Sequence, residues 1–209
     1  MTEEATNALE YRLTSELDAP TAKELVRKIG SALLDWSPPS VAPTEIGSLV
    51  VFAFGNRVES DGTVLPGPVN SQLADVTQTL AIRLEVPVFA QWEVADLLIG
   101  RGVERVFSIR PDVAPDGSTV YLNTERVAQK AVEMAAAEEV TLGQVGVVAF
   151  RDHAVRCVAH ARGVGMESAA IPEGVVLPCT YDPQSGQPWT RYRVAYVLAD
   201  IKARLSTIS

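Results

Sequence analysis

Cysteine and histidine are scarce in this sequence. Cys157 and Cys179 lie far apart in the chain, and His153 and His160 are the only histidines. So few sulfur and imidazole groups exclude a disulfide framework, and no CxxC or HExxH spacing indicates a zinc site. This cysteine usage is typical of a cytoplasmic protein, and we expect no bound metal.

An excess of positive charge is also missing. The 209 residues include 18 Lys and Arg against 26 Asp and Glu, which gives a formal net charge of −8. Such a surface offers no general attraction to a polyanion. We therefore expect no nucleic-acid partner.

Long apolar runs are absent as well. The longest run, around Leu49 to Phe54, is far shorter than the roughly 20 apolar residues that cross a bilayer. The N-terminal stretch MTEEATNALEYRLTSELD is acidic and polar, and it lacks the basic region and apolar core of a signal peptide. We expect neither a membrane anchor nor export.

Several motifs of common enzyme classes are missing. The sequence has no GxxxxGK[ST] phosphate loop, no GxGxxG after its first apolar run and no GxSxG. These absences exclude a P-loop, the usual dinucleotide site and the nucleophile turn of α/β-hydrolases. The glycine-rich loop of a common methyltransferase is missing too.

What the sequence does contain is an alternation of strand and helix patterns. Apolar, β-prone runs predict strands at 48–54, 86–90, 105–109 and 146–150, with a short strand near 168–171. Helical patterns lie at 69–84, 92–101, 121–138, 152–163 and 189–205. The alternation predicts an α/β fold: a doubly wound, mostly parallel, Rossmann-like sheet of about five strands flanked by helices.

The N-terminal part has a different pattern. Apolar residues recur at helical spacing from Thr6 to Trp36, with a break at 18–20, and a proline-containing loop follows at 37–43. We expect two helices there. The chain is thus predicted to be one domain over 1–209, with a helical extension at 1–45 and the core at 46–209.

In an open α/β sheet, ligands bind outside the carboxyl ends of the strands. The loop after the first predicted strand begins Gly55, Asn56, Arg57. Gly55 allows a sharp turn and a close approach of the backbone to a ligand, and Arg57 can hold a carboxylate or phosphate. We expect all three to bind a ligand; the alternative is a hairpin-like excursion with a solvated arginine.

Two helix starts follow later strands. Glu93 lies in the first turn after the second strand, where it either stabilises the positive helix end or takes part in binding. Asn123 and Thr124 resemble a helix entry. One of them is expected to cap the helix while the other faces the ligand.

The segment 151–156, RDHAVR, follows the fourth long strand. His153 and Arg151 come in the first helical turn, where an imidazole can act as a general base, although simple packing is the alternative. Arg156 shares one helix side with His153. We expect His160 to have a structural or surface role and Cys157 to be a small buried apolar residue.

Taken in order, these segments resemble the YdcF-like family (the SanA, ElyC and YdcF group, a domain of uncharacterised function). The resemblance covers roughly 46–205 and depends on the strand ending in GNR, then on 93–103, 123–128 and 151–156. It implies functional roles for Glu93, Asn123, Thr124, His153 and Arg156. It also implies a soluble branch of the family that binds S-adenosylmethionine or another nucleotide-like ligand.

The sequence departs from the family pattern at two places. Ala90 to Trp92 replace a glycine pair, and 70–73 lack an early helical arginine. Both departures bear on whether the family's ligand and reaction are retained. They are consistent with the non-catalytic alternative that is given below.

These observations lead to one main hypothesis. The chain is a small-molecule enzyme or binder for an anionic ligand, for which a nucleotide-like molecule such as S-adenosylmethionine is one option. Arg57, Asn123, Arg151 and Arg156 would bind it, and His153 and Glu93 would act as acid and base. The alternatives are a methyltransferase, or a non-catalytic regulatory protein whose N-terminal helices bury an apolar surface against a partner or in a homodimer.

Overall fold

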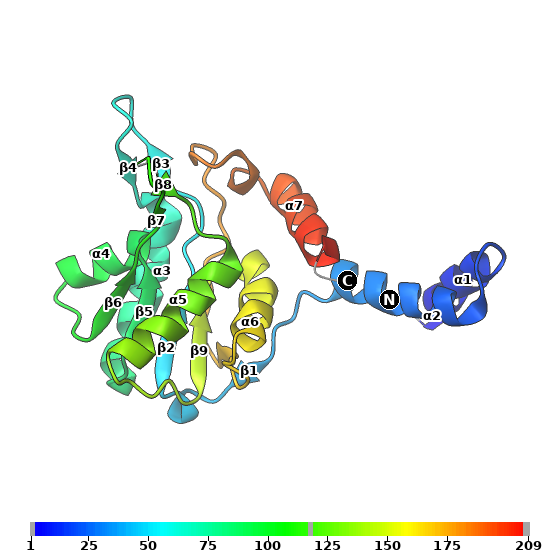
Figure 1. Cartoon of the computed structure of the whole chain (residues 1–209), viewed down its shortest axis with the longest axis horizontal. Helices are drawn as coiled ribbons and strands as arrows, with labels where there is room; N and C mark the ends of the chain where they lie inside the picture. The colour runs from blue at the N-terminus through cyan, green and yellow to red at the C-terminus, as the bar shows by residue number, and fades with distance from the viewer. Residues whose placement is uncertain (1–2, 117–118, 207–209) are drawn as a thin grey trace.

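The computed structural model describes residues 3–116 and 119–206 of the chain. Its centre is a four-stranded parallel sheet in the order β6-β5-β2-β9 (Figure 1). The strands are β2 (Ser48–Val51), β5 (Val88–Gln91), β6 (Val106–Ile109) and β9 (Val145–Val148). The chain steps outward from β2 to β6 and then returns to the other side of β2. The strand order therefore reverses between β2 and β9.

Helices cover both faces of this sheet. One face carries α3 (Gly67–Leu84) and α4 (Trp92–Gly100), and the other carries α5 (Thr124–Ala137) and α6 (Ala154–Gly163). Alternate residues of β2 belong to opposite cores: Leu49 and Val51 pack toward α3 and α4, and Val50 packs toward α5 and α6. Such strands are buried on both faces, which explains their continuous apolar runs. The predicted α/β, parallel-sheet architecture is confirmed.

The first predicted strand is shorter than its apolar run. β2 ends at Val51, although the run continues to Phe54. Beyond Phe52, side chains replace the neighbouring strands as hydrogen-bond partners. The Ala53 N–H donates to Gln91 Oε1 at 2.7 Å, and the Phe54 N–H donates to Asn70 Oδ1 at 2.8 Å. The backbone thus leaves the sheet while its polar groups stay satisfied.

The sheet also lacks the expected fifth strand. Near 168–171, a single parallel bridge joins Ala170 to Gly146, and β10 (Ile171–Pro172) pairs instead with β1 (Ser40–Val41). Pro172 has no N–H to donate, and Gly174 follows with φ of +72°. These two residues end the strand after one step.

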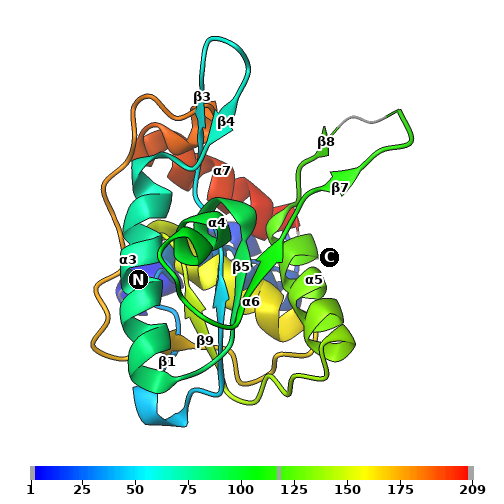
Figure 2. The same ribbon diagram turned by 90° about the vertical axis from the view of Figure 1, so that its left-hand side faces the viewer.

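Two hairpins and a C-terminal helix complete the carboxyl edge of the sheet. The hairpins β3 (Arg57–Val58) with β4 (Val64–Leu65) and β7 (Asp112–Val113) with β8 (Thr119–Val120) both project from this edge (Figure 2). The C-terminal segment passes over the same edge through η3 (Pro188–Thr190) and continues into α7 (Arg193–Ser206). Two further short helices are η1 (Pro43–Glu45) and η2 (Arg151–His153).

The N-terminal segment forms α1 (Glu3–Thr14) and α2 (Ala19–Leu34), which pack against each other and extend away from the α/β core, with α2 in contact with α7 (Figure 1). The break between them is fixed by Asp18, whose carboxylate accepts hydrogen bonds from the Thr21 N–H and hydroxyl. Among the described residues, no helix combines the length and apolar character needed to cross a membrane.

Candidate functional site

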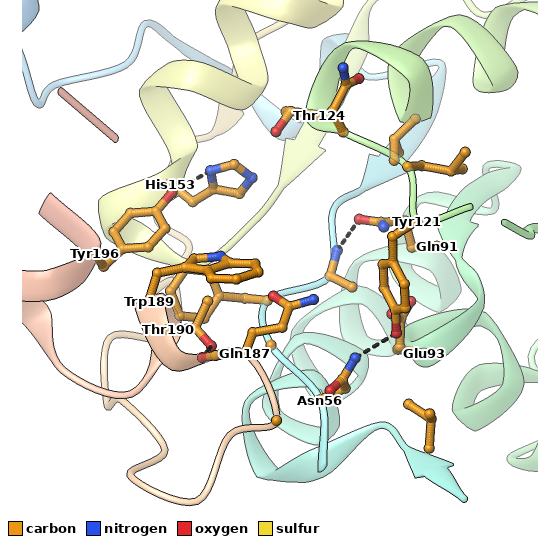
Figure 3. A pocket seen from close by; sticks show the side chains of 18 of the residues that line it. Asn56, Gln91, Glu93, Tyr121, Thr124, His153, Gln187, Trp189, Thr190 and Tyr196 are labelled. Atoms are coloured by element: carbon orange, nitrogen blue, oxygen red, sulfur yellow. Dashed lines mark hydrogen bonds between the residues drawn. The ribbon is translucent and has the colours of Figure 1, made fainter. Parts of the chain in front are cut away.

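A cleft of about 460 Å³ opens at the carboxyl edge over the ends of β5, β2 and β9, and it includes the junction between β2 and β9 (Figure 3). This is the position where the strand order reverses, and open α/β sheets bind ligands there. Its polar and aromatic lining comes from four successive strand-to-helix connections and from the C-terminal segment. These side chains are Phe54, Asn56, Gln91, Glu93, Tyr121, Asn123, Thr124, His153, Arg156, Gln187, Trp189, Thr190 and Tyr196.

Seven of the nine residues that the sequence suggests for the site line this cleft: Gly55, Asn56, Glu93, Asn123, Thr124, His153 and Arg156. The other two, Arg57 and Arg151, are not among its lining residues. The carboxyl-edge rule therefore brings together residues that are up to 101 positions apart in the chain, from Gly55 to Arg156.

One wall of the cleft contains Glu93. Its side chain is only 2% exposed, and within the described chain its Oε2 has no hydrogen-bond partner. Burial raises the pKa of Glu93 to about 7, because the charged form loses its hydration, and the Asp96 charge adds to the shift. Both protonation states are thus populated near neutral pH, as acid–base catalysis requires.

Tyr121 and Asn56 lie beside Glu93 on this wall (Figure 3). The Asn56 Nδ2 donates to the Tyr121 hydroxyl at 2.5 Å. Burial, together with the Glu93 charge, raises the pKa of Tyr121 to about 12. Tyr121 therefore keeps its proton, and its ring forms a fixed surface of the cleft.

The opposite wall contains a buried network around Tyr196. Its hydroxyl lies 2.5 Å from His153 Nδ1 and also contacts Arg156 Nη2 at 3.1 Å and Asp200 Oδ1 at 3.2 Å. The Arg156 Nε donates to the same Asp200 oxygen at 2.5 Å. Three side chains from α6 and α7 are thereby locked together with His153.

His153 is held in its neutral form. Burial lowers its pKa well below the ordinary value, and the Arg156 charge lowers it further. A neutral imidazole with Nδ1 engaged by Tyr196 is a fixed part of the wall. Of the two expected acid–base groups, Glu93 is therefore the one whose titration lies near pH 7.

Of the two residues at the start of α5, one caps the helix, as the sequence suggests. Asn123 is the N-cap, and its Oδ1 accepts from the Arg126 N–H at 2.8 Å. The Thr124 hydroxyl accepts from Arg156 Nη1 at 3.0 Å. Both residues also line the cleft, so the cap and the arginine are joined at one end of it.

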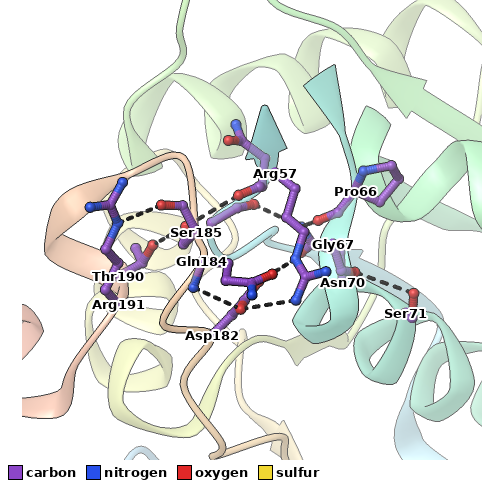
Figure 4. A network of polar contacts seen from close by, with 12 residues as sticks. Arg57, Pro66, Gly67, Asn70, Ser71, Asp182, Gln184, Ser185, Thr190 and Arg191 are labelled. Carbon is purple, nitrogen blue, oxygen red and sulfur yellow. Dashed lines mark hydrogen bonds and ion pairs between the residues drawn. The ribbon is translucent and has the colours of Figure 1, made fainter. Parts of the chain in front are cut away.

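Arg57 does not line the cleft, and its side chain reaches toward Asp182 of the C-terminal segment (Figure 4). It forms an ion pair with Asp182, with Nε–Oδ2 at 2.9 Å and Nη2–Oδ1 at 3.2 Å. Close by, the hydroxyls of Ser185 and Thr190 lie 2.7 Å apart, and the Gly186 N–H donates to the Asn56 carbonyl at 2.7 Å. These contacts fasten the segment 182–190 onto the loop after β2.

Gly55 makes that close approach possible. Its φ is +68°, and a Cβ at this position would lie 2.7 Å from Ser185 Oγ and 2.9 Å from Thr190 Oγ1. The glycine was expected to let the backbone approach a ligand. In the structure, the C-terminal segment itself makes the approach.

Arg151 lies on the outer side of η2. It contacts the carboxylate of Asp152 at 3.1 Å, as does Arg193 at 2.8 Å, and Tyr181 donates to the same group at 2.9 Å. The pKa of Asp152 is lowered, because these hydrogen bonds together outweigh its burial. This cluster tethers α6 to the C-terminal segment and lies outside the cleft lining.

The two remaining candidates of segment 151–160 have no part in the cleft. Cys157 is fully buried within the core under α6, where burial raises the pKa of its thiol well above the usual value. A thiol of this kind is not nucleophilic. His160 is not a lining residue either.

Sequence reasoning missed several lining residues, namely Gln91, Tyr121, Gln187, Trp189, Thr190 and Tyr196. Gln91 is the last residue of β5, so the carboxyl-edge rule was sufficient to find it. Tyr121 follows β8 of an antiparallel hairpin, and the sequence pattern did not predict that strand. The C-terminal residues gave no such signal, because only the folding back of the chain brings them to the edge.

Across 3–116 and 119–206, no group of three His, Cys, Asp or Glu side chains is arranged to hold a metal ion. No protein-family model, curated protein or solved structure matches the chain. The resemblance to the YdcF-like family therefore stays a prediction from the sequence.

Proposed function

We propose that the cleft binds a small anionic, nucleotide-like molecule and that Glu93 exchanges a proton with it. The observation that carries the proposal is the unpartnered, buried carboxyl group of Glu93 in a cleft at the strand-order reversal. Leaving such a group without a partner costs about 1–3 kcal/mol, and functional sites are where such costs persist.

The end of the cleft near α5 and α6 suits an anion. Arg156 lines it, and although three of its nitrogens contact Asp200, Thr124 and Tyr196, a guanidinium carries five N–H donors. The first turns of α5 and α6 start at the same end, and helix N-termini favour negative charge. A phosphate or carboxylate group of the ligand would lie here.

The other end of the cleft supplies acid–base capacity. Glu93 titrates near neutral pH, and the neutral His153 with Tyr196 forms a fixed polar wall across from it. This arrangement supports proton transfer by Glu93 alone rather than by a pair of catalytic groups. His153 would then position Arg156 and Tyr196.

Ligand screening by thermal denaturation tests the proposal. Nucleoside mono-, di- and triphosphates, S-adenosylmethionine and sugar phosphates would be compared on the full chain. A ligand at about 100 times its Kd stabilises the fold by about 2.7 kcal/mol.

Trp189→Ala should abolish the stabilisation, because this half-exposed indole lines the cleft. Tyr192→Ala is the matched control, because Tyr192 is a neighbouring exposed aromatic residue outside the lining. Equal stabilisation of both variants, or none for any anion, would contradict the proposal.

A further inference from the structure

The carboxylate oxygen of Glu93 that has no hydrogen-bond partner determines which chemical groups of a ligand it can bind. An ionised carboxylate only accepts hydrogen bonds, so its natural partner is an N–H or O–H donor of the ligand. Among the described residues none occupies Oε2, and the side chain is 98% buried, so bulk water does not hydrate it freely. The donor must therefore come from the part of the ligand that enters this end of the cleft.

Aromatic rings define the shape of that part. The ring of Tyr121 stands beside Glu93, and the indole of Trp189 lies across the cleft from them (Figure 3). The indole is 52% exposed, so its surface is available to a ligand. A flat heteroaromatic ring can stack between such surfaces, and stacking on an aromatic side chain contributes about 1–3 kcal/mol.

We infer that this end of the cleft recognises a nucleobase-type ring of the guanine class through two adjacent N–H groups that donate to Glu93. The inference rests on the proposed function and adds the class of ligand. A guanine edge presents a ring N–H beside an amino group, and both match a carboxylate. An adenine edge presents one donor beside an acceptor, and the acceptor would face the carboxylate oxygen unfavourably.

The polar surroundings agree with this assignment. The charged or titratable groups that act on Glu93 are Asp96 on its own helix and Tyr121 from the loop after β8. Neither offers a positive charge that would neutralise the carboxylate. Donors from the ligand would favour the ionised form, so binding near pH 7 should release a proton.

Calorimetry with three probes tests the inference: guanosine monophosphate, adenosine monophosphate and ribose 5-phosphate. We expect guanosine monophosphate to bind at least about 10-fold more tightly than adenosine monophosphate, because a bidentate pair discriminates by this order. Titrations in two buffers of different ionisation enthalpy should show proton release with the guanine nucleotide.

The variant Glu93→Gln should weaken guanosine monophosphate about 10-fold or more, since an amide opposes one ligand N–H with its own, and it should abolish the proton release. Glu104→Gln is the control, because it makes the same chemical change at an exposed glutamate outside the lining. It should keep the affinity.

The outcomes separate the two proposals. Equal binding of both nucleotides, or unchanged binding by Glu93→Gln, would overturn the inference and leave the anion site in place. Uptake of a proton instead of release would also overturn it, because Glu93 would then be the donor. No binding of any of the three phosphates would contradict the proposed function itself.

Discussion

Arg57 and Asp182, 125 residues apart in the chain, face each other as a bidentate ion pair, with Nε–Oδ2 at 2.9 Å and Nη2–Oδ1 at 3.2 Å. The pair joins the loop after β2 to the segment that carries Gln187, Trp189 and Thr190 into the cleft. Arg57 is thus placed to hold one wall of the cleft without lining the cleft itself.

Arg57→Ala should loosen the segment 182–190 and weaken ligand binding about 3- to 10-fold, because side chains ordered in advance must then be ordered on binding. Arg57→Lys should bind the ligand as weakly as Arg57→Ala, since lysine lacks the forked geometry that pairs with a carboxylate. Hydrogen exchange of 182–190 and a binding titration measure the two effects. Arg27→Ala, which removes another arginine–carboxylate pair far from the cleft, is the control and should change neither.

Gly55→Ala should destabilise the fold by about 2–4 kcal/mol, because the substitution combines a left-handed backbone with a close contact to Ser185 and Thr190. Gly62→Ala is the matched variant: φ is +86°, but the space is open. It should cost only about 1 kcal/mol. Urea denaturation gives the free energy of unfolding of both variants. Equal losses of stability would show that the packing of 182–190 on Gly55 contributes nothing.

The raised pKa of Glu93 predicts how stability depends on pH. Its value of about 7 in the fold lies above the ordinary value of 4.5, so the unfolded chain loses its proton first as pH rises. Protonated Glu93 therefore contributes about 3 kcal/mol to the free energy of unfolding. This contribution is fully present below about pH 4.5 and is lost progressively as the pH rises to about 7. Glu93→Gln should remove this slope from the free energy of unfolding.

The surface variant Glu59→Gln serves as its control and should retain the slope, because Glu59 is exposed on the β3–β4 hairpin. If the free energy of unfolding depends on pH in the same way in the wild type and in Glu93→Gln, then Glu93 is not held in a desolvated site.

Tyr196→Phe should destabilise the fold by about 2 kcal/mol, because His153, Arg156 and Asp200 all lose a partner in a buried network. Tyr192→Phe removes a hydroxyl from an exposed ring and should cost almost nothing. Thermal denaturation gives the comparison. Tyr196→Phe should also weaken anion binding, because Arg156 then loses its hydrogen bond to the Tyr196 hydroxyl.

The sequence predicted the sheet well because strand and helix periodicity are local properties. Each main strand lies within or next to its apolar run, and each flanking helix overlaps its predicted range. The ends were less predictable. Ala53 and Phe54 look like strand, yet their N–H groups donate to Gln91 and Asn70, which are 38 and 16 residues away.

The site was predictable to the extent that topology alone determines it. Residues directly after parallel strands meet at one edge, which brought Asn56, Glu93, Thr124 and His153 together. The outward turn of Arg57 was not predictable, because it depends on Asp182 in a segment without periodic pattern. Trp189 and Tyr196 fall in the predicted helix 189–205, but a helical pattern alone does not place that helix over the carboxyl edge.

The central claim is that the cleft at the carboxyl edge is the ligand site. Backbone amide NMR spectra recorded during titration with guanosine monophosphate test it most directly. The account predicts saturable shift changes at Asn56, Glu93, Thr124, His153 and 187–190, with little change on α1 and α2. Shift changes confined to other surfaces, or none at saturating nucleotide, would contradict it.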